Sequence, residues 1–201
     1  LFRLCLNVTF VSIVLDIISA ICIEQAAYLP LWVVQATTNL YFLMTPLMPA
    51  TCIIYILTLI YEKSPNKNTY KFSTWAVWLL YGVNIVLVAA NLFIGCLFFF
   101  DSGLNYIRGP LNKWPFVISY ICLILGVVSC LFERKYLDKS TVRVLVLFPI
   151  ISIMLLGIQQ FYTNIILSGT AATISILIVY LSFQNKKIVT DNLTGLSNRE
   201  T

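Results

Sequence analysis

The stretch from Trp114 to Phe132 reads WPFVISYICLILGVVSCLF and contains no charged residue. About 20 consecutive apolar residues are enough for an α-helix to cross the hydrocarbon core of a bilayer. This run is continuous, whereas the strands of a membrane β-barrel alternate apolar and polar residues in segments of about ten. The stretch therefore predicts a membrane-spanning helix.

Five further apolar windows of this kind occur in the sequence. They cover about residues 4–23, 31–61, 74–100, 142–161 and 163–183. The composition agrees, because 60% of the residues are apolar, 10% are charged and the mean hydropathy is +0.91, far from the balance of a water-soluble domain. We expect an all-α fold, a polytopic helical membrane bundle with six spans.

Lysine and arginine residues indicate the orientation, because the cytoplasmic connections of a membrane protein retain an excess of them. With the C-terminus inside, only Arg108 and Lys113 lie outside. The other eleven lie on the cytoplasmic side: Arg3, Lys63, Lys67, Lys71, Arg134, Lys135, Lys139, Arg143, Lys186, Lys187 and Arg199. These residues form no stripe with interleaved aromatic side chains, so no nucleic-acid partner is expected. The sequence predicts a multi-pass protein with a cytoplasmic C-terminus.

Asp16 is the acidic residue placed deep inside a predicted span. A charged group at mid-membrane costs roughly 2.5–3.5 kcal/mol on insertion scales, and it usually faces a partner or a cavity. Ser12, Ser19 and Ala20 share its helix face, because they lie three or four residues away from it. Two interpretations stay open. Asp16 is either a protonated or hydrogen-bonded packing residue, or a ligand-binding or proton-linked residue.

Amide side chains gather in the outer halves of several predicted spans. Gln35 and Asn39 lie one turn apart, and Trp32 lies one turn before Gln35. Amides in membrane helices most often bind one another, but the common depth of these side chains also predicts an outward-facing ligand pocket. The candidate ligand-binding residues are Asp16, Trp32, Gln35, Asn39, Asn91, Arg108, Trp114, Tyr120, Gln159, Gln160 and Asn164.

The external connections cover about residues 24–30, 101–113 and 162–164. None of them is long enough to fold into a separate sensory domain. A signal would then be read within the helix bundle, at its external mouth or from the lipid. Tryptophan at this depth is also a common interface anchor, so that role stays open for Trp32 and Trp114.

The chain contains no histidine. This excludes imidazole metal ligands, a histidine phosphoacceptor and a Ser-His-Asp triad, and we expect no catalytic residue, metal site or cofactor in these residues. The six cysteines lie in apolar windows without Cys-x-x-Cys spacing, where cysteine packs as a small hydrophobic residue. Pro46, Pro49 and Pro149 interrupt predicted helices and permit kinks, so a hinge role is a hypothesis for them.

Residues 191–201 read DNLTGLSNRET. Seven of them match every fixed position of the D-x-L-T-G-L-x-N-R motif that opens GGDEF domains: Asp191, Leu193, Thr194, Gly195, Leu196, Asn198 and Arg199. The segment resembles the start of a diguanylate cyclase domain. This resemblance implies a parent receptor that makes cyclic di-GMP from two GTP molecules with Mg²⁺. It also implies a homodimer in which two output domains face each other.

A second, more diffuse resemblance covers most of the chain. Its markers are Tyr106-Ile107-Arg108-Gly109-Pro110-Leu111, Trp114-Pro115-Phe116, Ser119-Tyr120 and Gln184-Asn185-Lys186. Together they resemble the seven-helix sensor regions that precede GGDEF domains and some histidine kinases. The resemblance implies a sensor role without a defined ligand, and it implies a further span before residue 1.

These observations predict a transmembrane sensory domain over residues 1–183, a signalling-helix linker over 184–190 and the first residues of a GGDEF domain over 191–201. The sensory domain would bind a small or lipophilic signal among its helices and regulate the cyclase through its last helix, with the lipid bilayer of a bacterial cytoplasmic membrane as its surroundings. Two alternatives stay open. A small-solute transporter would also use Asp16, amides and kinked helices, and a passive membrane anchor would only hold and dimerise the cyclase.

Overall fold

The computed structural model describes residues 1–62, 64–137, 139–161, 173–174, 177 and 180. Five helices in this part of the chain are long and apolar enough to cross a membrane. They are α1 (Phe2–Glu24), α2 (Leu31–Glu62), α3 (Lys67–Ile94), α4 (Trp114–Phe132) and α5 (Lys139–Phe161). The prediction of a helical bundle with membrane-type spans is confirmed for these residues. Most of the predicted sixth span, residues 163–183, lies outside them.

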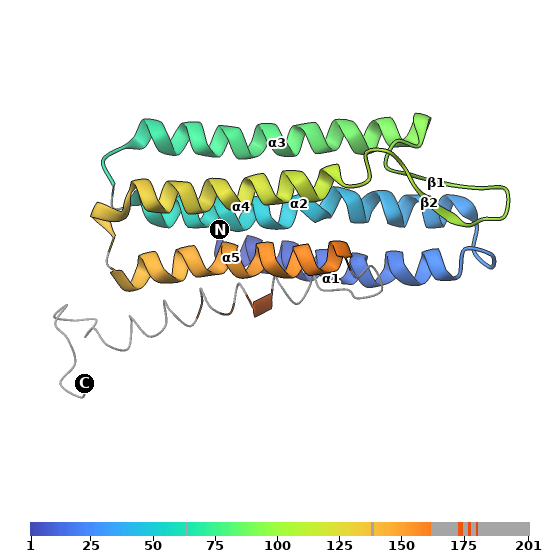
Figure 1. The fold of residues 1–201 in the computed structure, drawn as a ribbon, viewed down its shortest axis with the longest axis horizontal. Coiled ribbons are helices and arrows are strands. Elements are labelled where there is room, and N and C mark those ends of the chain that lie inside the picture. Colours follow the sequence, from blue (N-terminus) through green and yellow to red (C-terminus); the bar gives the residue numbers. More distant parts are fainter. Residues whose placement is uncertain (63, 138, 162–172, 175–176, 178–179, 181–201) are drawn as a thin grey trace.

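The five helices lie side by side and alternate in direction (Figure 1). α2 is central, because it packs against α1, α3 and α4. Its second half buries Ile53, Leu57 and Ile60 completely. α4 approaches α2 closely at Gly126, where an added side chain would collide with Ile53. Lipid tails are as apolar as these side chains, so close packing of this kind holds such a bundle together.

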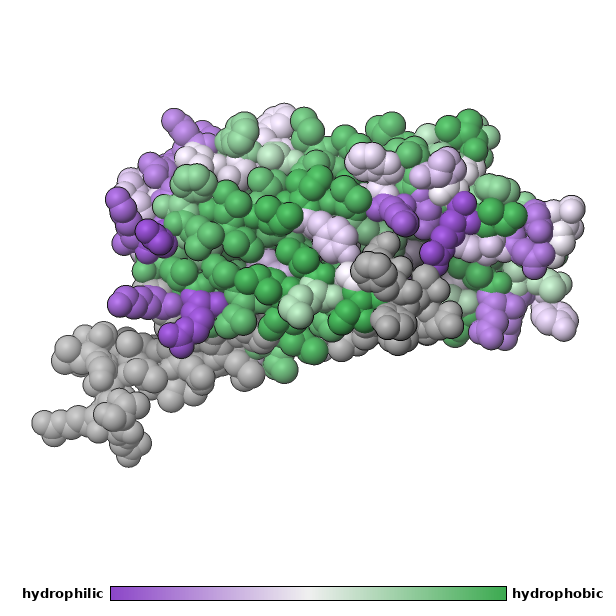
Figure 2. All heavy atoms as spheres, viewed as in Figure 1, coloured by the Kyte–Doolittle hydropathy of each residue, from purple (hydrophilic) through white to green (hydrophobic). Residues whose placement is uncertain are grey.

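The two ends of the bundle differ in charge. The connection between α2 and α3 lies at one end with the short 3-10 helix η1 (Arg134–Tyr136), and the connection between α1 and α2 lies at the other (Figure 1). The first end, which we call the basic end, carries Lys67, Lys71, Arg134, Lys135 and Lys139. Figure 2 shows an apolar band between polar side chains at the two ends. The sequence predicts this asymmetry for cytoplasmic and external connections.

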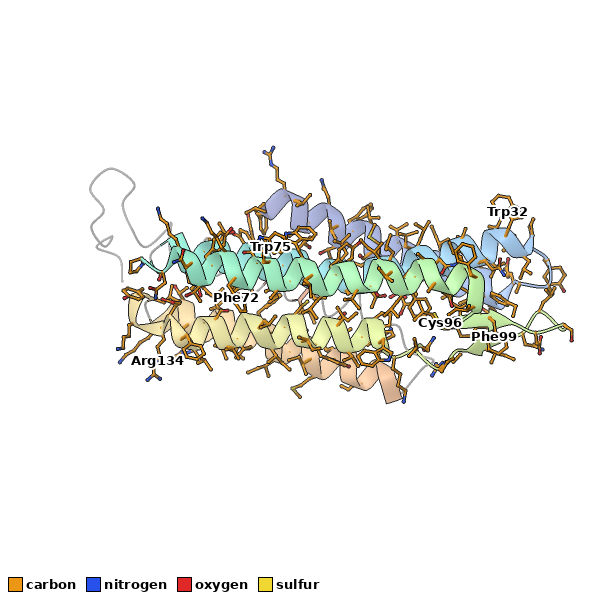
Figure 3. The ribbon with its side chains drawn as sticks, turned by 90° about the horizontal axis from the view of Figure 1, so that it is seen from above. Trp32, Phe72, Trp75, Cys96, Phe99 and Arg134 are labelled. Atoms are coloured by element: carbon orange, nitrogen blue, oxygen red, sulfur yellow. The ribbon has the colours of Figure 1, made fainter. Side chains whose placement is uncertain are left out.

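α3 exposes large apolar side chains on its outer face. Trp75, Val86 and Phe93 are 74%, 68% and 87% exposed, and Figure 3 shows Phe72 and Trp75 on this helix. Water-soluble monomers rarely expose a continuous apolar surface of this kind. The face therefore fits contact with the hydrocarbon tails of a bilayer.

The chain between α3 and α4 contains a short β-hairpin, which the sequence analysis did not predict. β1 (Phe98–Phe100) pairs antiparallel with β2 (Tyr106–Arg108). The predicted third span was wrong at this end, because it continued to residue 100, whereas α3 ends at Ile94. Gly95 ends the helix with a left-handed φ of 59°, which favours glycine because it has no Cβ. The three phenylalanines of β1 favour a strand, yet they also continue the apolar run, so hydropathy did not show the break.

Gly109 follows β2 where two backbone segments touch. Its N–H donates to the Leu97 carbonyl at 2.8 Å, and an added Cβ would collide with the backbone carbonyl of Cys96. We expect Gly109→Ala to lower the free energy of unfolding by about 1–3 kcal/mol, because a carbonyl cannot move aside as a flexible side chain can. Thermal unfolding in mild detergent measures the change. Gly82→Ala on α3 is the control, since nothing lies within 4 Å of its added Cβ; equal losses for both variants would contradict the expectation.

Asp101 organises the hairpin turn. Its Oδ1 accepts from the backbone N–H of Asn105 at 2.8 Å and of Gly103 at 2.9 Å, and its Oδ2 accepts from Asn105 Nδ2 at 3.2 Å. These bonds, with the Asn105 backbone first, lower the pKa of Asp101. Because the folded state has the lower pKa, the turn is fully stabilised above the ordinary value of about 3.9 and loses this support as the pH falls through the lowered pKa.

The expected result is faster amide hydrogen exchange at Gly103 and Asn105 below that pH, relative to the intrinsic rate at the same pH. Asp101→Asn should remove the pH dependence, since an amide does not titrate in this range. Protection that stays constant down to the lowest accessible pH in the unmodified protein would rule out the ionised carboxylate as the organiser of the turn.

Candidate functional site

Pro46 frees a backbone carbonyl in the middle of α2. A helical residue at position 46 would donate its N–H to the carbonyl of Phe42, four residues earlier, but proline has no N–H. Asn84 of α3 takes over this role, because its Nδ2 donates to the Phe42 carbonyl at 3.1 Å. Asn84 is fully buried. The proline and the asparagine therefore form one structural unit across two helices.

Pro49 frees the Thr45 carbonyl in the same way. Ser119 of α4 lies at hydrogen-bond distance from it, with 3.4 Å between Ser119 Oγ and the carbonyl oxygen, and it donates more closely to the Pro115 carbonyl at 2.9 Å. Both proline positions of α2 are thus covered by polar side chains of neighbouring helices. A hinge motion at these prolines would have to break the contacts, and the hinge role stays a prediction.

Asn39 and Asn91 meet between α2 and α3. Asn91 Nδ2 donates to Asn39 Oδ1 at 3.1 Å, and Asn91 Oδ1 accepts from the N–H groups of Leu97 at 2.7 Å and Phe98 at 3.1 Å. Asn39 Nδ2 donates back to the Gln35 carbonyl at 2.8 Å. The structure therefore brings two of the predicted site residues together, and there they fix the turn that leads from α3 into β1.

An aromatic cluster lies beside this amide pair. The ring of Phe98 stacks on Phe42 and on Tyr106, with 5.7 Å between the ring centres in both cases, and it meets Phe100 edge to face at 5.9 Å. Tyr120 of α4 packs against the same cluster. These side chains fill this end of the bundle and pack the hairpin against α2 and α4.

The remaining predicted ligand-binding residues that the structure describes lie on α2, β2, α4 and α5. Trp32 is 72% exposed near the start of α2, where Figure 3 labels it, and Trp114 is 47% exposed at the start of α4. Gln35 and Arg108 are also exposed, while Gln159 is half-buried in α5. The side chain of Gln160, the whole of Asn164 and the motif residues from Asp191 to Arg199 lie outside the described part of the chain. A ligand role for these residues stays a prediction.

Asp16 is buried where three helices meet. Its side chain is 7% exposed, and it lines a cavity of about 20 Å³ between α1, α2 and α5. The polar residues around this cavity are Ser12, Tyr41 and Thr45, and apolar side chains that include Met44 and Leu156 close it. Such a volume holds about one water molecule. The residue therefore lines a small, mostly apolar cavity with a few polar groups, which has room for about one water molecule.

Tyr41 and Thr45 are parts of the Asp16 site that sequence reasoning missed. They lie four residues apart on α2, and Thr45 Oγ1 donates to the Tyr41 carbonyl at 2.9 Å. Their polar groups are typical of many helix faces, and no local pattern shows that this face of α2 meets Asp16. The nearby Pro46 was the available signal, since a proline-containing segment in a span needs polar neighbours.

Glu133 forms a second buried carboxylate site, at the basic end. It is 4% exposed and accepts from Ser64 Oγ at 2.7 Å and from Asn66 Nδ2 at 3.0 Å. Ser64 Oγ in turn accepts from the Asn66 N–H at 3.2 Å. The carboxylate thus ties the connection between α2 and α3 to the residues that follow α4. Sequence reasoning missed this link, because the partners lie 69 and 67 positions apart.

Metal binding has no visible basis in the described ranges, where no group of three or more His, Cys, Asp or Glu side chains is placed to hold an ion. The cysteines of these ranges are all buried and free. Comparison with known proteins gives no family to which the geometry can be referred: no protein-family model, no curated protein and no solved structure matches the chain.

Proposed function

We propose that the chain is the membrane sensory domain of a receptor that controls a cytoplasmic diguanylate cyclase in a bacterial cytoplasmic membrane. The observation that carries this proposal is the motif from Asp191 to Arg199, which resembles the opening of a GGDEF domain and follows a series of apolar spans. The cyclase domain itself would bind GTP and Mg²⁺ and work as a dimer. The sensory domain would set the relative arrangement of the two output domains and would supply no catalytic group.

The arrangement of the helices supports an inside location for the output domain. The connections from α2 to α3 and from α4 to α5 lie at the basic end, and those from α1 to α2 and from α3 to α4 lie at the opposite end, which carries the hairpin (Figure 1). α5 leads away from the basic end, so one further crossing by residues 163–183 would return the chain to it. The excess of lysine and arginine at that end favours a cytoplasmic location for it, where GTP is available.

The size of the Asp16 site favours a sensor over a transporter. A transporter needs a substrate site near the middle of the membrane, and the cavity at Asp16 holds only about one water molecule. The amides Asn39 and Asn91, which also suggested a solute site, are bonded to each other.

Coupling through the last helix can be tested in the full-length parent protein. Insertion of one, two, three or four residues after Lys187 rotates the output domain by about 100° per residue if the linker is helical. We expect cyclic di-GMP production in membranes to vary with this helical phase, so that some insertions restore activity that shorter ones abolish. A catalytically inactivated output domain is the control for background. Activity that ignores phase at every length, or a parent protein without a cyclase domain, would overturn the proposal.

A further inference from the structure

A cluster of cationic side chains lies where α4 leads into α5. Arg134 and Lys135 belong to η1. Lys139 and Arg143 lie in the first two turns of α5. All four side chains are exposed, and Figure 3 shows Arg134 at the basic end, on the side of α4 that faces away from α3. We call these four residues the α4–α5 basic cluster. A concentration of one sign of charge on a surface attracts a partner of the opposite sign.

The charge of the α4–α5 basic cluster is not neutralised within the described part of the chain. None of its four side chains has an ion-pair partner there. Glu133 directly precedes Arg134, but it is buried, and its oxygens accept from Ser64 and Asn66, which are neutral. The cluster therefore has positive charge available to bind an anion.

An apolar stripe continues from the cluster along the exposed side of α5. Leu147, Ile150 and Met154 are 43%, 43% and 63% exposed. They follow Arg143 at the three- and four-residue intervals of one helix face. Phe132, the last residue of α4, is 78% exposed and adds apolar surface two positions before the cluster begins. The surface thus presents cations at the end of the bundle and apolar side chains along its length, which is the order of headgroup and acyl chain in one leaflet of a bilayer.

We propose that this surface binds an anionic phospholipid, whose phosphate lies among the four cations and whose acyl chain lies along the apolar stripe of α5. Basic side chains next to a membrane span attract anionic headgroups. The guanidinium groups of Arg134 and Arg143 also match a phosphate, because each can donate two parallel hydrogen bonds to it. This assignment goes beyond the function proposed above and does not depend on it.

Photocrosslinking in vesicles tests the lipid and its site together. The chain is reconstituted into phosphatidylcholine vesicles that contain a trace of phosphatidylglycerol with a diazirine in one acyl chain. After irradiation, we expect label on residues 147–154 of α5, about fivefold or more above the label from a phosphatidylcholine analogue with the same diazirine. Raising NaCl from about 0.05 to about 0.5 M should remove most of this difference, because salt screens exposed charges. Equal labelling by the two lipids, or a difference that salt leaves unchanged, would overturn the proposal.

Two double variants at the basic end separate this site from a general effect of charge. Arg134→Gln with Arg143→Gln should lower the phosphatidylglycerol label on α5 about fivefold. Lys67→Gln with Lys71→Gln removes the same charge from α3, where the lysines also precede an exposed apolar residue, Trp75. This second variant should leave the label on α5 within about twofold.

All four replaced side chains are exposed, so both variants should keep the fold. An equal loss of label in the two variants would show a general attraction of the basic end and count against the site. Displacement of the label by glycerol phosphate, which is soluble in water, would show a site for free anions and overturn the lipid assignment.

Discussion

Asn91→Leu is expected to lower the free energy of unfolding by about 2–5 kcal/mol. The substitution removes the hydrogen bond to Asn39 and leaves the N–H groups of Leu97 and Phe98 without an acceptor. Each buried donor that loses its partner costs about 1–3 kcal/mol. Unfolding in mild detergent, followed by circular dichroism, measures the total.

The controls separate the turn from general packing. Asn39→Leu removes the bond between the two amides and leaves the acceptor for both N–H groups in place, so its cost should be clearly smaller. Leu92→Ala changes the next residue of α3, which is 66% exposed, and should have little effect. If Asn91→Leu were no more costly than Leu92→Ala, the amide would not hold the turn from α3 to β1.

Asn84→Leu is expected to cost about 1–3 kcal/mol, because it leaves the Phe42 carbonyl buried without a donor. The loss should depend on Pro46. In a Pro46→Ala background the new N–H of residue 46 can bond to that carbonyl, so the cost of Asn84→Leu should fall by about 1 kcal/mol or more, which a double-mutant cycle measures.

Pro49→Ala provides the matched cycle. Pro49 frees the carbonyl of Thr45, which Asn84 does not contact, so its coupling to Asn84→Leu should stay within about 0.5 kcal/mol. Equal coupling to both prolines would mean that Asn84 acts through general packing between α2 and α3. The prediction that Asn84 specifically compensates for Pro46 would then be wrong.

Hydropathy predicted the helices well where an apolar run ends at charged or turn-forming residues. The predicted span from Trp114 to Phe132 coincides with α4, since Lys113 precedes it and Glu133 follows it. The third span failed at Gly95, because a left-handed turn and a strand of phenylalanines are as apolar as a helix. Hydropathy measures transfer into lipid, and it carries no information about backbone conformation.

The candidate sites were predictable as residue types and not as pairs. Asp16 and Asn91 stand out because polar side chains are costly in a bilayer, and both are buried as such a cost requires. Their partners depend on which helices become neighbours. Asn91 and Asn39 lie 52 positions apart, and no spacing within one helix encodes that contact.

The orientation of the bundle is the claim on which the receptor proposal depends, and single-cysteine labelling tests it most directly. Ser102→Cys places a thiol in the exposed hairpin turn, and Asn68→Cys places one in the exposed first turn of α3 at the basic end. The native cysteines of the described residues are buried, so they give little background. With a membrane-impermeant maleimide added to bacterial spheroplasts, we predict that Ser102→Cys is labelled at once and that Asn68→Cys is labelled only after the membrane is opened. The reverse pattern, or immediate labelling of both, would contradict a cytoplasmic basic end.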